Sequence, residues 1–381
     1  MIVIVYPQFY GVGGIARYLD SFLSNLPADA PEVVLITGDA VAGAKTYPNV
    51  ELIHLPMGKS RLGLAWWSWK ARRCIETLQQ RAPVTAVNLH VPPLIPGLFM
   101  SRKFPIMLTA HSTYLGMSSS FDGKRNFRGL WGALSLWLKV RMERFIIARA
   151  DMVITLTQDG QEQLARYGRR DRIAIVPNGV DLAQFTSAGA GVKDIDLLFC
   201  GRIERAKGSR AMVEVCQQLI AENSQVRIVI VGYGADEDHV RQQLGAFPSN
   251  VVLTGKVPFS DMVGYYRRSK VYASTSYYEG LPGTCLEAMA VGLPVVVWNL
   301  PFYRDLVKIN VTGLVAETNH HQRMVAGIQQ LLADPARAHD MGQQARVHVH
   351  ERYDWRRLSR QLLNVHGALV QTMPSTVQVA Q

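Results

Sequence analysis

Hydrophobic positions in the first half of the chain follow two alternating patterns. Short runs rich in β-branched residues are typical of buried strands, and apolar positions with helical spacing separate them at 14–26 and 66–80. This alternation predicts a parallel sheet with crossover helices. The expected strands cover 2–5, 32–36, 84–89, 105–110, 152–155 and 172–176.

A second series of the same kind follows a break at Pro177-Asn178-Gly179. The chain therefore predicts an α/β protein with two tandem Rossmann-like, doubly wound domains facing an inter-domain cleft, since such sheets bind ligands beyond the carboxyl ends of their strands. An amphipathic helix is expected at 353–370. The expected strands of the second series are 197–200, 226–231, 251–254, 271–274 and 294–298.

Domain borders follow from the same patterns. We expect a first domain at 1–178 and a second at 179–355. A C-terminal helix and tail, 356–381, is expected to pack back on the first domain, with a frayed end at 371–381.

Composition and charge narrow the class of protein. With 381 residues, 48% hydrophobic and 19% charged, the chain is typical of globular domains and unlike disordered or collagen-like chains. Residues 1–178 hold 21 Lys and Arg against 12 Asp and Glu, net +9, whereas the remainder holds 20 against 18, net +2. A basic first half predicts a negatively charged partner, namely a phosphorylated acceptor, an anionic membrane face or nucleic acid. A solubilising surface bias is the alternative.

The sequence predicts a cytoplasmic protein with reduced cysteines. The first residues, Met1–Pro7, lack a basic leader, and prolines interrupt the charge-free segment 82–101, which excludes a continuous spanning helix there. The four cysteines are scattered singly, unlike those of disulfide scaffolds, zinc ribbons or redox pairs.

A glycine-rich segment follows the first expected strand. Gly11–Ala16 fits the dinucleotide pattern of nicotinamide enzymes, but residues 6–10 separate it from the strand and we expect no acidic residue at the end of the second strand. A nicotinamide enzyme is therefore disfavoured. We instead expect Gly13 and Gly14 to let backbone N–H groups at the start of a helix approach a phosphate.

Three other motifs are weak. Gly58-Lys59-Ser60 lacks the first glycine of a Walker A loop, and Asp194-Ile195-Asp196 lies before a strand, so its carboxylates are expected to be linker residues. The histidines at 320–321 and 348–350 lack metal-site spacing and are expected on helix surfaces. No metal site is predicted.

The second domain carries sharper chemistry. Its first strand ends before Gly201, and two cations, Arg202 and Lys207, precede the next helix. An arginine can donate two parallel hydrogen bonds to phosphate oxygens and a lysine supplies a point charge, so the pair suits a diphosphate. A solvated basic turn is the alternative.

Two carboxylates lie around a later glycine-rich turn. Seven residues separate Glu279 from Glu287, and the turn leads into a helix. The helix start favours an anion, and carboxylates accept hydrogen bonds from the hydroxyls of a sugar or ribose. An ordinary loop and helix would show the same spacing only by chance.

These motifs resemble glycosyltransferase family 4, retaining enzymes of the GT-B fold, over nearly the whole chain. The resemblance implies an acceptor-binding first domain and a second domain that binds a nucleotide-diphosphate sugar. The matching motifs are the Gly-Gly loop, G-R-x-x-x-x-K-G, V-P-N-G-V-D at 176–181, and E-x7-E followed by A-M-A-x-G-x-P-V-V.

The resemblance also implies roles for the matching residues. The donor diphosphate would lie beside Gly13 and Gly14 and be held by Arg202 and Lys207, while Glu279 would hold hydroxyls of the donor sugar. The ribose would be held by Glu287, and the transferred sugar would face His111. Backbone contacts and the nucleobase surface would come from Gly283, Thr284, Lys256 and Val257.

The expected catalytic group is His111, Arg202, Lys207 and Glu279. We expect a front-face transfer in which the departing phosphate oxygen takes the acceptor proton, the two cations stabilise the leaving group and no metal is needed. Double displacement with Glu279 as nucleophile is the alternative. The turn 281–284 leaves the donor open between UDP- and GDP-linked hexoses, mannose included.

The acceptor is expected to be a saccharide or a polyprenyl-linked saccharide, as in lipopolysaccharide, O-antigen or exopolysaccharide assembly. A helix at 129–147 and the segment 66–73 interleave tryptophans with cations, which favours peripheral contact with an anionic membrane on its inner face. A core-facing helix with a solvated basic side is the alternative. Other function classes left open are a silent GT-B scaffold and a GT-B epimerase or phosphorylase; nucleic-acid binding is disfavoured because no motif supports it.

Overall fold

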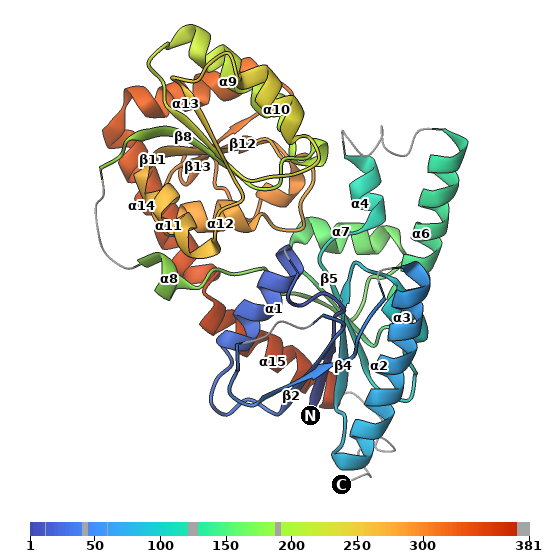
Figure 1. The fold of residues 1–381 in the computed structure, drawn as a ribbon. Helices are drawn as coiled ribbons and strands as arrows, with labels where there is room; N and C mark the ends of the chain where they lie inside the picture. The colour runs from blue at the N-terminus through green and yellow to red at the C-terminus, as the bar shows by residue number, and fades with distance from the viewer. Residues whose placement is uncertain (12, 40–44, 59, 121–128, 187–191, 372–381) are drawn as a thin grey trace. The chain divides into compact units, whose positions relative to one another are not determined.

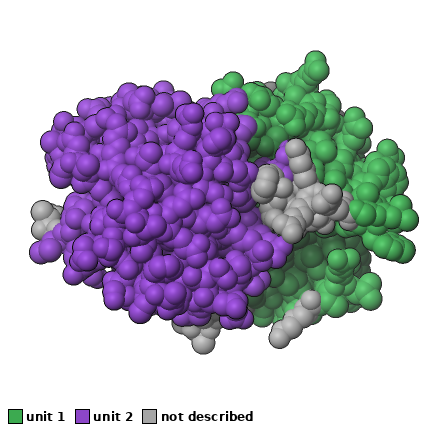
Figure 2. Space-filling model, turned by 90° about the horizontal axis from the view of Figure 1, so that it is seen from above, with its two compact units in different colours: residues 1–118, 127–179, 355–381 green, residues 119–126, 180–354 purple. Residues whose placement is uncertain are grey.

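The computed structural model describes residues 1–11, 13–39, 45–58, 60–120, 129–186 and 192–371. The chain divides into two compact units, coloured separately in Figure 2. Unit 1 comprises residues 1–118, 127–179 and 355–381, and unit 2 comprises residues 119–126 and 180–354. Each unit is built on one parallel sheet with helices on both faces (Figure 1).

Unit 1 has a seven-stranded sheet in the order β3-β2-β1-β4-β5-β6-β7. The strand order reverses at β1, which lies between β2 and β4, and this is the switch point where ligands bind in open parallel sheets. The strands are β1 Ile2–Val5, β2 Val33–Thr37, β3 Val50–His54, β4 Ala86–Val91, β5 Ile106–Ala110, β6 Met152–Thr155 and β7 Ile173–Ile175. The helices are α1 Gly14–Ser24, α2 Arg61–Arg81, α3 Ile95–Phe99, α4 Tyr114–Ser119, α6 Leu130–Arg149, α7 Gln158–Arg166 and α15 Trp355–Gln371.

Unit 2 has a six-stranded sheet in the order β10-β9-β8-β11-β12-β13. Its switch point lies between β8 and β11, which pair in parallel. The strands are β8 Ile195–Cys200, β9 Ile228–Val231, β10 Val251–Gly255, β11 Ser269–Ser274, β12 Val295–Trp298 and β13 Gly313–Ala316. The helices are α8 Leu182–Thr186, α9 Ser209–Glu222, α10 Glu237–Leu244, α11 Phe259–Arg268, α12 Gly283–Ala290, α13 His321–Ala333 and α14 Pro335–Arg352, with 3-10 turns at Arg205–Lys207 and Pro301–Tyr303.

The α/β prediction is confirmed, but two strands were missed. β3 is an edge strand whose residues are only half-buried or exposed, and it carries Glu51 and His54, so it lacks a continuous apolar run. β13 is four residues long and begins and ends with the small residues Gly313 and Ala316. Neither pattern stands out from a loop, because strand prediction relies on longer β-branched runs.

Helices α1 and α15 join the two ends of the chain within unit 1. The Tyr18 ring of α1 meets the Trp355 ring of α15 edge-on with centroids 4.8 Å apart, and the Ser359 hydroxyl donates to the Phe22 carbonyl at 3.4 Å. Figure 1 shows α1 and α15 together on one side of the sheet. The first turns of α15 therefore help to hold the helix that begins at Gly14.

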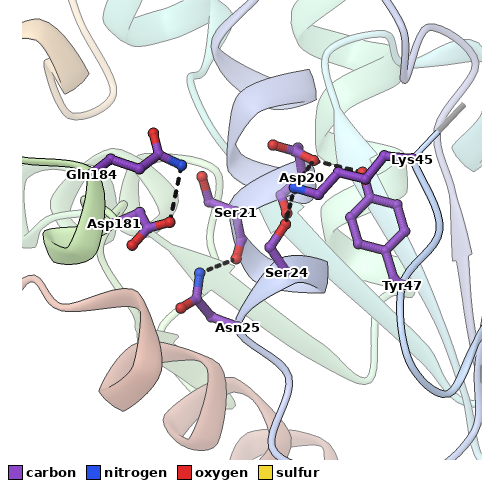
Figure 3. A network of polar contacts seen from close by, with 8 residues as sticks. All are labelled: Asp20, Ser21, Ser24, Asn25, Lys45, Tyr47, Asp181 and Gln184. Carbon is purple, nitrogen blue, oxygen red and sulfur yellow. Dashed lines mark hydrogen bonds and ion pairs between the residues drawn. The ribbon is translucent and has the colours of Figure 1, made fainter. Parts of the chain in front are cut away.

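A polar network fixes α1 to the chain before β3 (Figure 3). Asp20 Oδ1 accepts from the Tyr47 hydroxyl at 2.6 Å and from Lys45 Nζ at 3.2 Å, and Lys45 Nζ also donates to Ser24 Oγ at 2.6 Å. Asn25 closes the helix by donating to the Ser21 carbonyl at 2.9 Å. Because α1 is held along its length, the position of its glycine-bearing first turn is fixed as well.

Candidate functional site

The loop after β8 leads the chain across the carboxyl end of the sheet in unit 2. Gly201 has φ +146° and Gly208 has φ +70°, both in the region that favours glycine. A Cβ on Gly208 would lie 1.9 Å from the Thr275 carbonyl oxygen, so the loop fits against the segment after β11 only with glycine there. This close approach joins the two strands of the switch point.

Further hydrogen bonds hold the two loops together. The Tyr277 backbone N–H donates to the Ala206 carbonyl at 3.1 Å, and Thr275 Oγ1 donates to the Gly208 carbonyl at 3.0 Å. The buried indole of Trp298 donates to the Thr275 carbonyl at 3.0 Å. Side chains that project from these loops are therefore carried on a rigid frame.

That frame brings Lys207 and Glu279 together. Lys207 Nζ lies 2.5 Å from Glu279 Oε2, and each side chain is only about a fifth exposed, at 20% and 19%. The sequence assigns these residues to separate motifs, and the structure makes them one ion pair beside the β8–β11 switch point. An ammonium and a carboxylate held side by side can meet a phosphate and a sugar hydroxyl respectively.

Arg202 is the second predicted cation, and it lies in a more open position. Its Nη1 donates to Glu204 Oε1 at 2.8 Å, and its side chain is 57% exposed. An exposed pair of this kind is weak, so the guanidinium can exchange Glu204 for a ligand phosphate at little cost. Arg205, between the two predicted cations, approaches Asp236 instead, at 3.9 Å.

Helix α12 carries the other motif residues of the turn. Gly283 begins the helix, and the Thr284 hydroxyl lies 2.8 Å from the Tyr272 hydroxyl. Glu287 lies one turn later, 4% exposed, where its Oε2 accepts from the Tyr266 hydroxyl at 2.8 Å. Tyr266 thus orients the carboxylate predicted to hold the ribose.

Lys256 and Val257 follow β10, next to the loop after β9. Lys256 Nζ lies 5.7 Å from the centre of the Tyr233 ring, and that ring is 37% exposed. Tyr233 lies between Gly232 and Gly234, both packed closely on the loop after β8. Sequence reasoning missed Tyr233, although an aromatic residue between two glycines after a strand is a detectable signal for a stacking surface.

Unit 1 carries the remaining predicted residues. Gly13 and Gly14 start α1 beyond β1, and none of the described residues has an atom within 4 Å of the place where a Cβ would stand on either. Gly13 has φ 178°, which any residue adopts. Unit 1 therefore gives no conformational reason for glycine at 13, and the open space fits a ligand approaching the helix start.

His111 follows β5 and is paired with a second histidine that the sequence analysis missed. His111 Nε2 lies 2.9 Å from His90 Nδ1, the two rings are stacked, and Tyr18 packs edge-on to His111 with centroids 4.7 Å apart. Burial lowers the pKa of His111 to about 3 and lowers the pKa of His90 well below its ordinary value. Both rings are therefore neutral at pH 7, and one ring donates its N–H to the unprotonated nitrogen of the other.

Comparison with known proteins identifies both halves of the chain. The model for "Glycosyltransferase Family 4" matches residues 12–184, and the model for "Glycosyl transferases group 1" matches residues 183–348. The chain belongs to glycosyltransferase family 4.

Relatives of this glycosyltransferase are distant in sequence. An uncharacterized glycosyltransferase of Methanocaldococcus jannaschii is 20% identical over 97% of this chain and 98% of its own length. A D-inositol 3-phosphate glycosyltransferase of Pseudarthrobacter chlorophenolicus is 28% identical, but the match spans 61% of this chain and 59% of that protein, less than two thirds of either.

Solved structures share the fold. Sucrose-phosphate synthase from Thermosynechococcus elongatus aligns with a TM-score of 0.81 at 19% identity over 98% of this chain and 99% of that one. Anabaena HepE in complex with UDP and glucose aligns with a TM-score of 0.77 at 18% identity over 96% and 99%. The predicted GT-B fold, with two Rossmann-like parts, is thereby confirmed.

Weak motifs in this family 4 glycosyltransferase are accounted for by internal contacts. Asp194 pairs with Arg268 and Asp196 with Lys270 at 2.7 Å, at the amino end of β8, so these carboxylates stabilise the fold. Ile195 and Asp196 lie within β8 rather than before it. Lys59 lies outside the described residues.

Asp39 lies two residues beyond the end of β2, and its carboxylate accepts from the Tyr10 backbone N–H at 3.0 Å and the Thr37 hydroxyl at 2.6 Å, so it serves the loop after β1. One expectation about a polar residue was wrong. His348 was expected on a helix surface but is 4% exposed, because it lies on the inner face of α14 near the Asp305 carbonyl.

No group of three or more His, Cys, Asp and Glu side chains is placed to hold a metal ion among the residues that the structure describes. Within the same described ranges, no helix has the length and apolar composition needed to cross a bilayer.

Proposed function

We propose that this family 4 glycosyltransferase is a retaining hexosyltransferase that uses a UDP- or GDP-linked sugar. The observation that carries the proposal is the Lys207–Glu279 ion pair at 2.5 Å, beside the switch point of the unit 2 sheet. Lys207 and Arg202 would hold the diphosphate, and Glu279 would accept hydrogen bonds from hydroxyls of the donor sugar. Glu287, oriented by Tyr266, would hold the ribose, and Tyr233 with Lys256 and Val257 would flank the base.

The proposed reaction follows from these roles. The bond between the anomeric carbon and the diphosphate oxygen breaks, its electron pair stays on the phosphate oxygen, and the acceptor oxygen bonds to the same face of the sugar. The acceptor proton passes to the departing phosphate oxygen. Arg202 and Lys207 stabilise the growing negative charge, so the protein's own cations provide the electrostatic stabilisation that a metal would otherwise supply.

Residues of unit 1 have proposed roles as well. His111 would lie near the transferred sugar as a neutral hydrogen-bonding group, because its low pKa excludes an imidazolium at pH 7. Gly13 and Gly14 would leave the first turn of α1 open toward a phosphate. The acceptor is proposed to be a saccharide or lipid-linked saccharide of the cell envelope.

Ligand-dependent thermal unfolding tests the donor proposal. Selective binding to the folded state adds about 2.7 kcal/mol of stability at a hundredfold excess over Kd. UDP or GDP should therefore raise the midpoint, with or without Mg²⁺, and ADP and TDP should not. Lys207→Met should reduce the shift to about a third of its size at the same ligand concentration, whereas Lys308→Met, which removes an exposed lysine elsewhere in unit 2, should retain it in full. A shift with NAD alone, or none at all, would contradict the proposal.

A further inference from the structure

Helix α6 exposes large apolar side chains instead of burying them. Leu130 and Trp131 are 81% and 80% exposed, and the other apolar side chains of the same stripe are between 45% and 56% exposed. Large exposed apolar patches on a folded domain mark interaction sites. The remaining members of the stripe are Leu134, Trp137, Leu138 and Phe145.

The geometry of the helix explains why these residues point outward. At 100° per residue, positions 130, 131, 134, 137, 138 and 145 fall within one sector of about 120°. Glu143, Ile146 and Ile147 are the buried residues of α6 and occupy the opposite side. The apolar stripe is therefore a second hydrophobic face, separate from the one that packs on the sheet.

Helix α2 repeats the arrangement. Leu62 and Trp66 are 83% and 60% exposed, Trp69 follows at the next turn, and the Trp66 and Trp69 rings stack with centroids 4.7 Å apart. The buried side chains of α2, among them Trp67 and Ala71, occupy the other side of the helix. Two helices of unit 1 thus carry outward tryptophans at helical spacing.

Each aromatic stripe has its own cations. Arg73 lies 5.9 Å from the Trp69 ring, Arg141 lies 5.6 Å from the Trp137 ring, and Arg149 lies 4.9 Å from the Phe145 ring. Carboxylates are nearly absent from both helices. The single acidic residue of α6, Glu143, is buried. That of α2, Glu76, pairs with both Arg72 at 3.2 Å and Arg73 at 3.5 Å, so the three side chains together keep one net positive charge.

The two stripes belong to one layer of unit 1. Helix α3 packs against both α2 and α6, and Figure 1 shows the three helices on the same side of the unit 1 sheet. We name the exposed set the tryptophan face, made of Leu62, Trp66, Trp69, Arg73, Leu130, Trp131, Leu134, Trp137, Leu138, Arg141 and Phe145.

We propose that the tryptophan face docks unit 1 on an anionic lipid bilayer. Tryptophan and leucine side chains enter the interface between headgroups and acyl chains, and arginines beside them meet negative headgroups. The charge of the tryptophan face indicates which partner binds it. The named residues of this face include arginines and no carboxylate, so the face is complementary to negative headgroups and not to the same face of a second copy. Two copies placed face to face would bring arginines together, which disfavours a self-dimer.

Docking on a bilayer would bring the enzyme to a lipid-linked acceptor. This purpose of docking rests on the proposed function. Binding to vesicles itself needs no nucleotide sugar, whereas the nucleotide-dependent unfolding shift needs no lipid. The two proposals can therefore fail separately.

Vesicle flotation of the full chain tests the docking proposal. Phosphatidylcholine vesicles containing phosphatidylglycerol should carry the protein upward, pure phosphatidylcholine vesicles should do so much less, and tryptophan emission should shift to shorter wavelength on binding. The double change Trp131→Ser and Trp137→Ser should weaken partitioning by well over tenfold, since each removes a large apolar side chain from the interface. Arg141→Gln should weaken binding to anionic vesicles about fivefold, the value of one cation at an anionic surface.

Matched controls isolate the surface from the fold. Val347→Ser changes a side chain that is 52% exposed on α14 of unit 2 and should leave flotation unchanged. All variants should keep the nucleotide-dependent unfolding shift of the unchanged protein. Absence of wild-type flotation, flotation that the tryptophan changes do not reduce, or a dimer in sedimentation that those changes dissolve would each overturn the proposal.

Discussion

The Lys207–Glu279 pair gives a prediction in which two changes at one contact have opposite effects. If Lys207 serves the diphosphate and Glu279 serves the sugar, Lys207→Met should weaken binding of the bare nucleoside diphosphate. Glu279→Gln should leave that binding unchanged or strengthen it, because the ammonium is no longer shared with a carboxylate. Only ligands that carry the sugar should lose affinity in Glu279→Gln.

The size of the effect follows from the contact distance and burial. At 2.5 Å between Nζ and Oε2, an effective dielectric of about 20 gives a gross attraction of about 7 kcal/mol. Both side chains are mostly covered, so the lost hydration offsets much of this attraction, and a charge-assisted hydrogen bond retains about 1.5–3 kcal/mol. Lys207→Met should therefore weaken diphosphate binding by about 2 kcal/mol, or about 30-fold. It should also destabilise the fold by a similar amount, about 2 kcal/mol, because Glu279 is left without its cation.

Isothermal titration with the nucleoside diphosphate and with its sugar form measures these effects. The double variant Lys207→Met, Glu279→Gln should recover most of the lost unfolding free energy, since neither charge then remains unpaired. It should not recover diphosphate affinity. The division of roles is wrong if Glu279→Gln weakens the bare diphosphate as much as the nucleotide sugar.

Three further predictions use contacts in both units. Gly208→Ala should lower the free energy of unfolding by about 2 kcal/mol or more in denaturant titrations, because the alanine would have to adopt a left-handed φ and its Cβ would clash with the backbone. Gly13→Ala should change that free energy by less than about 0.5 kcal/mol and affect only donor binding. His90→Phe removes the hydrogen bond to His111 and should lower kcat about tenfold, the free energy of roughly one hydrogen bond, without changing the nucleotide-dependent shift of the unfolding midpoint. In His90→Asn the amide nitrogen takes the place of Nδ1, so this variant should keep much of the original rate. Burial raises the pKa of Glu143 from its ordinary 4.5 to about 7. The protonated carboxyl therefore contributes its full stability below pH 4.5, and this stability, about 3 kcal/mol at most, is lost as the pH rises through 7. Urea unfolding at several pH values should show this loss, and Glu143→Gln should abolish it.

Much of the fold could be predicted because the buried strands are continuous apolar runs. The strands at 2–5 and 152–155 have the predicted bounds, since β-branched residues fill them and polar or turn residues flank them. The edge strand β3 could not be found in this way, because one side of an edge strand is unpaired and its residues need not be apolar. Periodicity identifies buried strands well and edges poorly.

The candidate site could be predicted residue by residue but not contact by contact. Lys207 and Glu279 were each expected to act, yet their pairing depends on β8 and β11 being neighbours, and strand order is not written in the spacing of motifs. The His90–His111 contact has the same origin, because β4 and β5 pair with Val91 opposite Ala110. A lone histidine inside a strand gives no signal until its neighbour strand is known.

The outward tryptophans show where amphipathic periodicity stops being informative. An apolar stripe at helical spacing predicts that the stripe leaves water, but it does not say whether the core or a bilayer receives it. In α6 the core takes Ile146, Ile147 and the carboxylate of Glu143, and the tryptophans remain outside. That choice is costly for a chain in water alone, since exposed tryptophan promotes association. The arginines beside Trp69 and Trp137 are the feature that distinguishes a membrane-binding face from an exposed core face, because a side chain that packs in a core would not be accompanied by charges that must stay in water.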